Sequence, residues 1–152
     1  MRSFCAPGLL FALSLCCGTG VAATGPLTLD QVKADPSPEH RAKAAVDYAA
    51  IAERAAEIAN DQGGMMQLDL ELKNMVAAME LARDSFTAAG KTPGRQPGSF
   101  KSVELKSHQM LVRLADLKHK MGEADRTLIE GPIMKVEEIH DAWFDGIMGK
   151  KK

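Results

Sequence analysis

The chain of 152 residues is poor in cysteine and in aromatic residues, and its charges nearly cancel. Its three cysteines all lie within the first 17 residues, so the rest of the chain can form no disulfide, thiolate metal site or thiol redox pair. Only 5% of the residues are aromatic, and the formal net charge is −1. This balance gives no global attraction to nucleic acid, and we expect no nucleic-acid partner. A hydrophobic content of 45% is too high for a disordered chain, which leaves a folded domain.

Sequence motifs of the common enzyme classes are also absent. The chain contains no G-x-S-x-G nucleophile motif, no glycine-rich phosphate loop and no H-E-x-x-H zinc motif. Its carboxylates fall mainly on the polar faces of amphipathic segments, where their usual role is solubility. We therefore expect a non-enzymatic protein with no catalytic residues and no bound cofactor.

Residues 1–23 have the composition of a signal peptide. Arg2 supplies a positive charge, a nearly uncharged segment follows, and Val21-Ala22-Ala23 places small residues before a cleavage site. We predict cleavage after Ala23, a periplasmic or secreted protein, and no transmembrane segment in the mature chain. Two alternatives remain open: an uncleaved membrane anchor, which needs about 20 apolar residues, and a lipid anchor at Cys16, which follows a sequence resembling a lipobox.

Glycine and proline divide the remaining chain into four segments in which apolar residues recur every three or four positions. The pattern predicts helices over about 38–61, 65–89, 100–121 and 123–148, with Ser37 capping the first and Pro132 bending the last. Short turns favour an all-α, up-and-down antiparallel four-helix bundle over residues 37–149. Residues 24–36 would be a linker and 150–152 a basic tail. The loop at 90–99 is long enough to allow a crossover instead.

Apolar side chains predict the buried face of each helix. In the first segment the predicted stripe is Ala44, Tyr48, Ile51, Ala55 and Ile58. In the second it keeps a seven-residue repeat and consists of Met65, Leu68, Leu72, Met75, Met79, Ala82, Phe86 and Ala89.

Three side chains are candidate metal ligands. Glu137 and His140 form an E-x-x-H pair, whose spacing places both on one helix face, as in di-iron helical bundles. In an up-and-down arrangement, His108 would lie at a similar level on the neighbouring helix. A metal site made by Glu137, His140 and His108 is therefore one hypothesis, and a set of solvated or edge histidines is the other.

Charge is divided unevenly between the last two segments. Residues 91–121 carry seven Lys and Arg against two acids, whereas residues 122–147 carry seven acids against two Lys and Arg. We expect these neighbouring helices to offset each other's charge. The alternative is a basic face on the third helix that binds a polyanion.

Three short stretches carry two resemblances. Leu27-Thr28-Leu29-Asp30-Gln31 resembles the L-T-x-x-Q signature of the Spy and CpxP family of periplasmic stress chaperones, although that family has two copies of it. The run from Lys91 to Pro97 and the ending Gly146–Lys152 resemble uncharacterised exported bacterial proteins. These resemblances imply an exported helical protein and no activity. We expect it to bind a protein partner or act as a scaffold in the cell envelope, as a monomer or homodimer.

Overall fold

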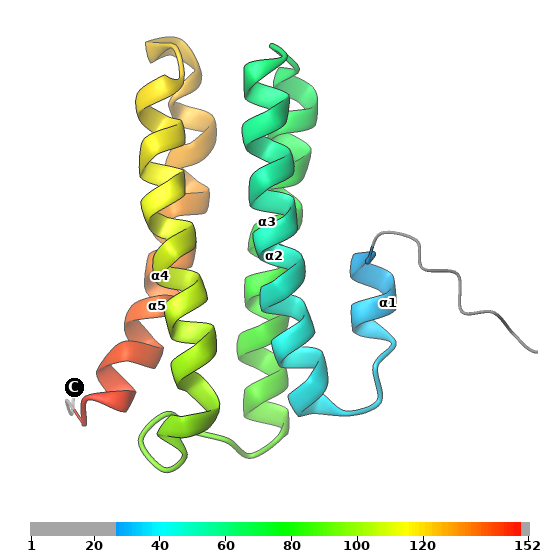
Figure 1. The fold of residues 1–152 in the computed structure, drawn as a ribbon, viewed down its shortest axis with the longest axis vertical. Coiled ribbons are helices and arrows are strands. Elements are labelled where there is room, and N and C mark those ends of the chain that lie inside the picture. Colours follow the sequence, from blue (N-terminus) through cyan, green and yellow to red (C-terminus); the bar gives the residue numbers. More distant parts are fainter. Residues whose placement is uncertain (1–26, 150–152) are drawn as a thin grey trace, which may run out of the picture.

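The computed structural model describes residues 27–149, and these residues are mostly helical (Figure 1). The helices are α1 (Leu29–Lys33), α2 (Pro38–Asp61), α3 (Met65–Ala88), α4 (Pro97–Lys120), the 3-10 turn η1 (Glu123–Asp125) and α5 (Thr127–Ile147). Over this range there is no strand, so the predicted all-α class with four long helices is confirmed. The predicted signal peptide and basic tail lie outside the described residues.

The helix ends follow local sequence signals. Ser37 Oγ accepts the backbone N–H of His40 at 3.4 Å, and Pro38 occupies the first position of α2, as predicted. Gly90 follows Ala89, the C-cap of α3, and takes a φ of +66°, a conformation that favours glycine. Helix α4 begins at Pro97, three residues earlier than expected, because a proline is favourable in the first turn. Helix α5 continues through Pro132, and η1 precedes it.

The predicted linker contains a short helix. Thr28 and Gln31 form a capping box at the start of α1: the Thr28 N–H donates to Gln31 Oε1 at 3.0 Å, and the Gln31 N–H donates to Thr28 Oγ1 at 3.3 Å. In this chain the L-T-x-x-Q motif thus starts a helix. Val32 is buried and joins the core.

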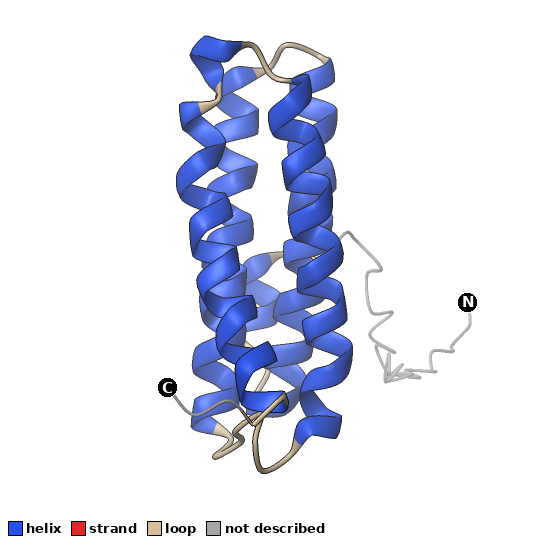
Figure 2. Ribbon diagram, turned by 90° about the vertical axis from the view of Figure 1, so that its left-hand side faces the viewer, coloured by secondary structure: helices blue, strands red, loops and turns tan. Residues whose placement is uncertain are grey.

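The four long helices lie side by side as two antiparallel pairs, α2 with α3 and α4 with α5 (Figures 1 and 2). Helix α2 also packs beside α4, and α3 beside α5. Within residues 27–149, α3 and α4 have no close backbone contact, and neither do α2 and α5. The loop between Ala88 and Pro97 therefore joins two diagonally opposite helices. The sequence had left this connection open.

The buried face of α2 differs from the predicted stripe. Ile51 and Ile58 are 48% and 57% exposed. Apart from Val46 and Glu53, the buried positions are instead six alanines spaced three and four apart: Ala42, Ala45, Ala49, Ala52, Ala56 and Ala59. Small side chains allow the backbone of α2 to lie close to its neighbour, which larger residues at these positions would prevent. The predicted stripe in α2 was thus wrong at Ile51 and Ile58, whereas Ala44 and Tyr48 are partly buried against the core.

The end of the fold near the diagonal loop is filled by aromatic rings. The ring centroids of Phe86 and Phe100 are 4.4 Å apart, and Trp143 lies 6.1 and 6.3 Å from them. These side chains bring α3, α4 and α5 together although α3 and α4 have no close backbone contact. The loop itself packs against α5, because Gly94 and Pro93 approach Gly146.

This close approach leads to a stability prediction. A Cβ added at Gly146 would lie 2.7 Å from the Pro93 Cβ, which is closer than carbon atoms tolerate. We expect Gly146→Ala to lower the free energy of unfolding by about 1–3 kcal/mol in urea denaturation. The control is Gly98→Ala in α4, where nothing lies within 4 Å and alanine favours the helix. Equal effects of the two substitutions would contradict the contact.

Candidate functional site

His140 is held between two carboxylates on the seam between α4 and α5. Its residue is 9% exposed, its Nδ1 lies 3.1 Å from Asp141 Oδ1, and its Nε2 lies 3.2 Å from Glu104 Oε1. Phe144 stacks on the imidazole with ring centroids 6.1 Å apart and an interplanar angle of 13°. The ring is thus fixed in orientation by both polar and aromatic neighbours.

His108 of α4 faces the same place. Its ring centroid lies 5.8 Å from that of His140, so the two histidines expected at one level are together. They border an open hollow of about 450 Å³, lined by Glu104, His108, His140, Asp141 and Phe144. We call this group of residues the histidine hollow.

Glu137, the third candidate ligand, is exposed and does not line the histidine hollow. Its expected place beside His140 is taken by Glu104, which belongs to the neighbouring helix. A sequence signal for Glu104 existed, because it precedes His108 by four residues and so shares its helix face. Over residues 27–149, no group of three or more His, Cys, Asp or Glu side chains could hold a metal ion.

The basic side chains of α4 pair mostly with α2. Lys106 binds Asp47, Arg113 Nε lies 2.6 Å from Glu53 Oε2, and Lys120 Nζ lies 2.6 Å from Glu57 Oε1. Towards α5, Lys118 Nζ lies 2.9 Å from Glu130 Oε1. Because the pairs with α2 advance together along both helices, α2 and α4 run in the same direction.

These pairs change the interpretation of the charge division. Lys91 Nζ also lies 2.5 Å from Glu39 Oε2, so five of the seven cations in residues 91–121 contact a carboxylate. The charge is offset locally, but mainly by α2 and less by α5, the neighbour that the sequence favoured. Paired cations leave little free positive charge for a polyanion.

Glu53 is the one fully buried carboxylate among the described residues. Arg113 reaches it from α4, but its second oxygen, Oε1, has no hydrogen-bond partner. Burial raises the pKa of Glu53 above its usual value, and the hydrogen bond from Arg113 opposes that shift. The sequence did not indicate this residue, although it lies on the same helix face as Ala49 and Ala56.

The raised pKa of Glu53 predicts a pH dependence of stability. The native state holds the Glu53 proton more tightly than the unfolded chain, so this residue's contribution to the free energy of unfolding decreases as pH rises from about 4.5 through the native pKa. The glutamine of the Glu53→Gln variant is neutral at every pH, so this variant lacks that dependence of stability on pH. We therefore expect the stability of the wild type relative to Glu53→Gln to fall with rising pH in urea titrations.

Comparing the wild type with Glu53→Gln removes the contribution of Glu39, whose effect on stability has the opposite dependence on pH. Hydrogen bonds from Lys91 and Lys43 lower the pKa of Glu39 to about 2, so its contribution is lost as pH falls towards that value. Both proteins share this residue. A wild-type stability that increases relative to Glu53→Gln with rising pH would contradict the prediction for Glu53.

A second hollow, of about 300 Å³, lies between α2 and α4, and the exposed apolar side chain of Ile51 lines it. Ile51 and Arg54 line it from α2, and Gln109 lines it from α4. Residues three, four or seven positions apart share a helix face. The exposed Ile58 therefore shares a face of α2 with Arg54, and the exposed Leu105 and Val112 share a face of α4 with Gln109. We call the resulting surface the α2/α4 face; it consists of Ile51, Arg54, Ile58, Leu105, Gln109 and Val112.

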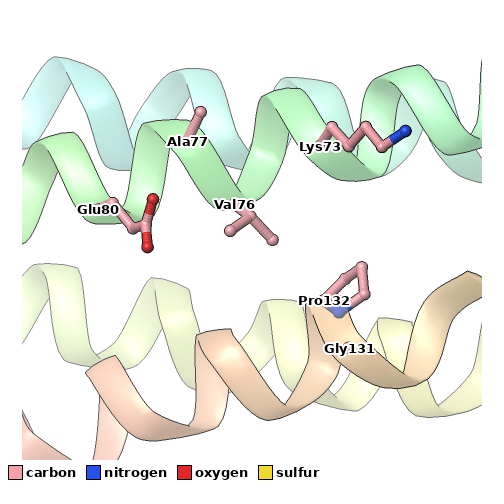
Figure 3. Close-up of a pocket in the computed structure, with 6 residues that line it drawn as sticks. All are labelled: Lys73, Val76, Ala77, Glu80, Gly131 and Pro132. Carbon is pink, nitrogen blue, oxygen red and sulfur yellow. The ribbon is translucent and has the colours of Figure 1, made fainter.

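A third hollow, of about 320 Å³, lies between α3 and α5 (Figure 3). Val76 and Pro132 point towards one another across it. Its charged residues are engaged elsewhere, since Lys73 Nζ lies 2.6 Å from Asp69 Oδ2 and Glu80 Oε1 lies 3.8 Å from Lys135 Nζ. The hollow thus offers small apolar surface and no convergent polar groups.

Comparison with protein-family models, curated proteins and solved structures finds no match to this chain. The resemblance to the Spy and CpxP family therefore remains a prediction from sequence. Among the described helices, none combines the length and the apolar composition that are needed to cross a membrane.

Proposed function

We propose that the protein is an exported, non-enzymatic four-helix bundle that binds a partner protein in the cell envelope through its α2/α4 face. The observation that carries this proposal is the hollow between α2 and α4, which the exposed Ile51 lines. Three further exposed apolar residues share a helix face with residues that line it: Ile58 on α2, and Leu105 and Val112 on α4. Clustered apolar side chains on a surface are typical of protein-binding sites, whereas single ones are common everywhere.

The composition of this face suits a protein partner. Besides its apolar residues, it contains the polar groups Arg54 and Gln109, which line the hollow and can form hydrogen bonds across an interface. The ion pairs of Lys106 and Arg113 with α2 hold the two helices at a fixed separation beneath it. A surface that is rigid before binding loses less entropy on association.

Photo-crosslinking in the native cell tests this surface. We expect a protein carrying a photoreactive phenylalanine analogue at Val112 to form one discrete adduct with an envelope protein, and Ile51→Ser in the same chain to abolish that adduct. The matched control places the analogue at Met134, which is 69% exposed on α5. No adduct from position 112, or equal adducts from both positions, would refute the proposed surface. An adduct with a second copy of the chain would replace the partner with a homodimer.

Export is supported by the composition of residues 1–23 and is tested separately. We expect the intact mass of protein from the native host to correspond to a chain beginning at Thr24. A mass that retains residues 1–23, or one with a lipid on Cys16 or Cys17, would contradict cleavage after Ala23.

A further inference from the structure

We propose that the α2/α4 face binds an amphipathic α-helix of another protein, and that Arg54 selects a helix whose apolar side carries an aspartate or a glutamate. This inference rests on the proposed function and adds the chemistry of the partner. It depends on two features of the face: the spacing of its exposed residues, and a charged side chain in its hollow that has no ion pair within the described residues.

The exposed residues of the face have the spacing of a helix-binding groove. Each helix contributes a row of three residues that are three and four positions apart: Ile51, Arg54 and Ile58 on α2, and Leu105, Gln109 and Val112 on α4. In both rows the outer two residues are apolar and lie about 10 Å apart along the helix axis. The hollow lies between the rows, because Ile51, Arg54 and Gln109 line it. A third helix with apolar residues at helical spacing can pack between two such rows.

Arg54 is the cation in the hollow that is available to a ligand. The other charged residues that line it are engaged, since Lys106 pairs with Asp47, and Arg113 Nε lies 2.6 Å from Oε2 of the buried Glu53. The exposed Arg54 forms no hydrogen bond or ion pair with any residue of the described range 27–149. Burial raises the pKa of Glu53, and the charges of Arg113 and Arg54 oppose that shift through space.

An arginine beside apolar side chains favours a carboxylate on the partner. The planar guanidinium can donate two parallel hydrogen bonds to a carboxylate, and neighbouring apolar groups that exclude water strengthen such a pair. A partner helix without an acid at this point would bury the guanidinium of Arg54 unpaired, which is unfavourable and provides specificity. A polyanion or an anionic lipid surface needs several free cations, whereas Lys106 and Arg113 are already paired.

Charge variants of Arg54 test this inference in the crosslinking assay with the photoreactive analogue at Val112. We expect Arg54→Glu to reduce the yield of the partner adduct at least about tenfold, because the reversed charge repels the carboxylate of the partner. Arg54→Gln, which removes the charge without reversing it, should reduce the yield less. The matched control is Arg95→Glu, which makes the same change in net charge at an exposed position in the loop after α3 and should leave the yield unchanged.

Mass spectrometry of the adduct identifies the part of the partner that lies on the face. We expect the crosslinked peptide to belong to a helix with an aspartate or glutamate among its apolar residues. Replacing that acid by lysine in the partner should weaken the adduct with the wild-type Arg54 and restore it with Arg54→Glu. Circular dichroism spectra identify any variant that fails to fold, and the exposed Arg54→Gln variant keeps the test valid if Arg54→Glu does so.

The possible failures distinguish this inference from the proposed function. No adduct from position 112 in the otherwise unchanged chain would refute the binding surface and the acidic partner together. An adduct that Ile51→Ser abolishes and Arg54→Glu leaves unchanged would keep the surface and overturn the acidic partner. Equal loss in Arg95→Glu would show an effect of net charge alone, which would also overturn it. An adduct with lipid or with a second copy of the chain would overturn the partner helix.

Discussion

Phe86→Ala is expected to lower the free energy of unfolding by about 3–5 kcal/mol, among the largest effects of any single substitution in the chain. Phe86 is 1% exposed, and its ring contacts those of Phe100 and Trp143. Removing it leaves a cavity where three helices meet, and α3 and α4 lose an aromatic contact that no close backbone contact replaces. Urea unfolding followed by circular dichroism measures the loss.

Met134→Ala is the control for this prediction. Met134 is 69% exposed on α5, so its replacement should change the free energy of unfolding by no more than about 0.5 kcal/mol. A loss below about 1 kcal/mol in Phe86→Ala would mean that the aromatic residues do not hold the two helix pairs together.

Arg113→Ala is expected to cost about 3–5 kcal/mol at neutral pH, because it leaves the fully buried Glu53 carboxylate without its partner. The control is Lys106→Ala, one heptad earlier on α4. Lys106 pairs with the exposed Asp47, and an exposed pair contributes only about 0–1 kcal/mol.

A second substitution identifies the origin of the effect. Glu53→Gln in the Arg113→Ala background removes the buried charge and should recover at least half of the lost stability. No recovery would show that Arg113 contributes through packing of its aliphatic chain and not through the charge of Glu53.

The helices could be predicted from sequence because their ends are set by local signals. Ser37, Pro38 and Gly90 fix backbone geometry within a few residues, and the observed bounds of α2 match the predicted ones. The buried face of α2 could not be found by the same reasoning. Ranking side chains by hydrophobicity selects Ile51 and Ile58, whereas close packing of two helices selects alanine.

The candidate site was predicted in part. The similar level of His108 and His140 follows from helix lengths and short turns, and the two rings lie together in the structure. Which carboxylate faces His140 depends on the rotation of α4 about its axis, which the sequence pattern does not specify. Glu104 and the buried Glu53 were missed for the same reason: their partners belong to other helices.

The diagonal loop after α3 has a consequence for how the chain folds. Contacts within the α2–α3 pair and within the α4–α5 pair join residues close in sequence, so each hairpin can form early with little loss of chain entropy. Docking of one hairpin on the other is then the late step. A longer loop should slow that step only slightly, since each doubling of its length costs about 0.6 kcal/mol. Folding of this chain thus resembles the association of two different helical hairpins that the loop after α3 keeps close together.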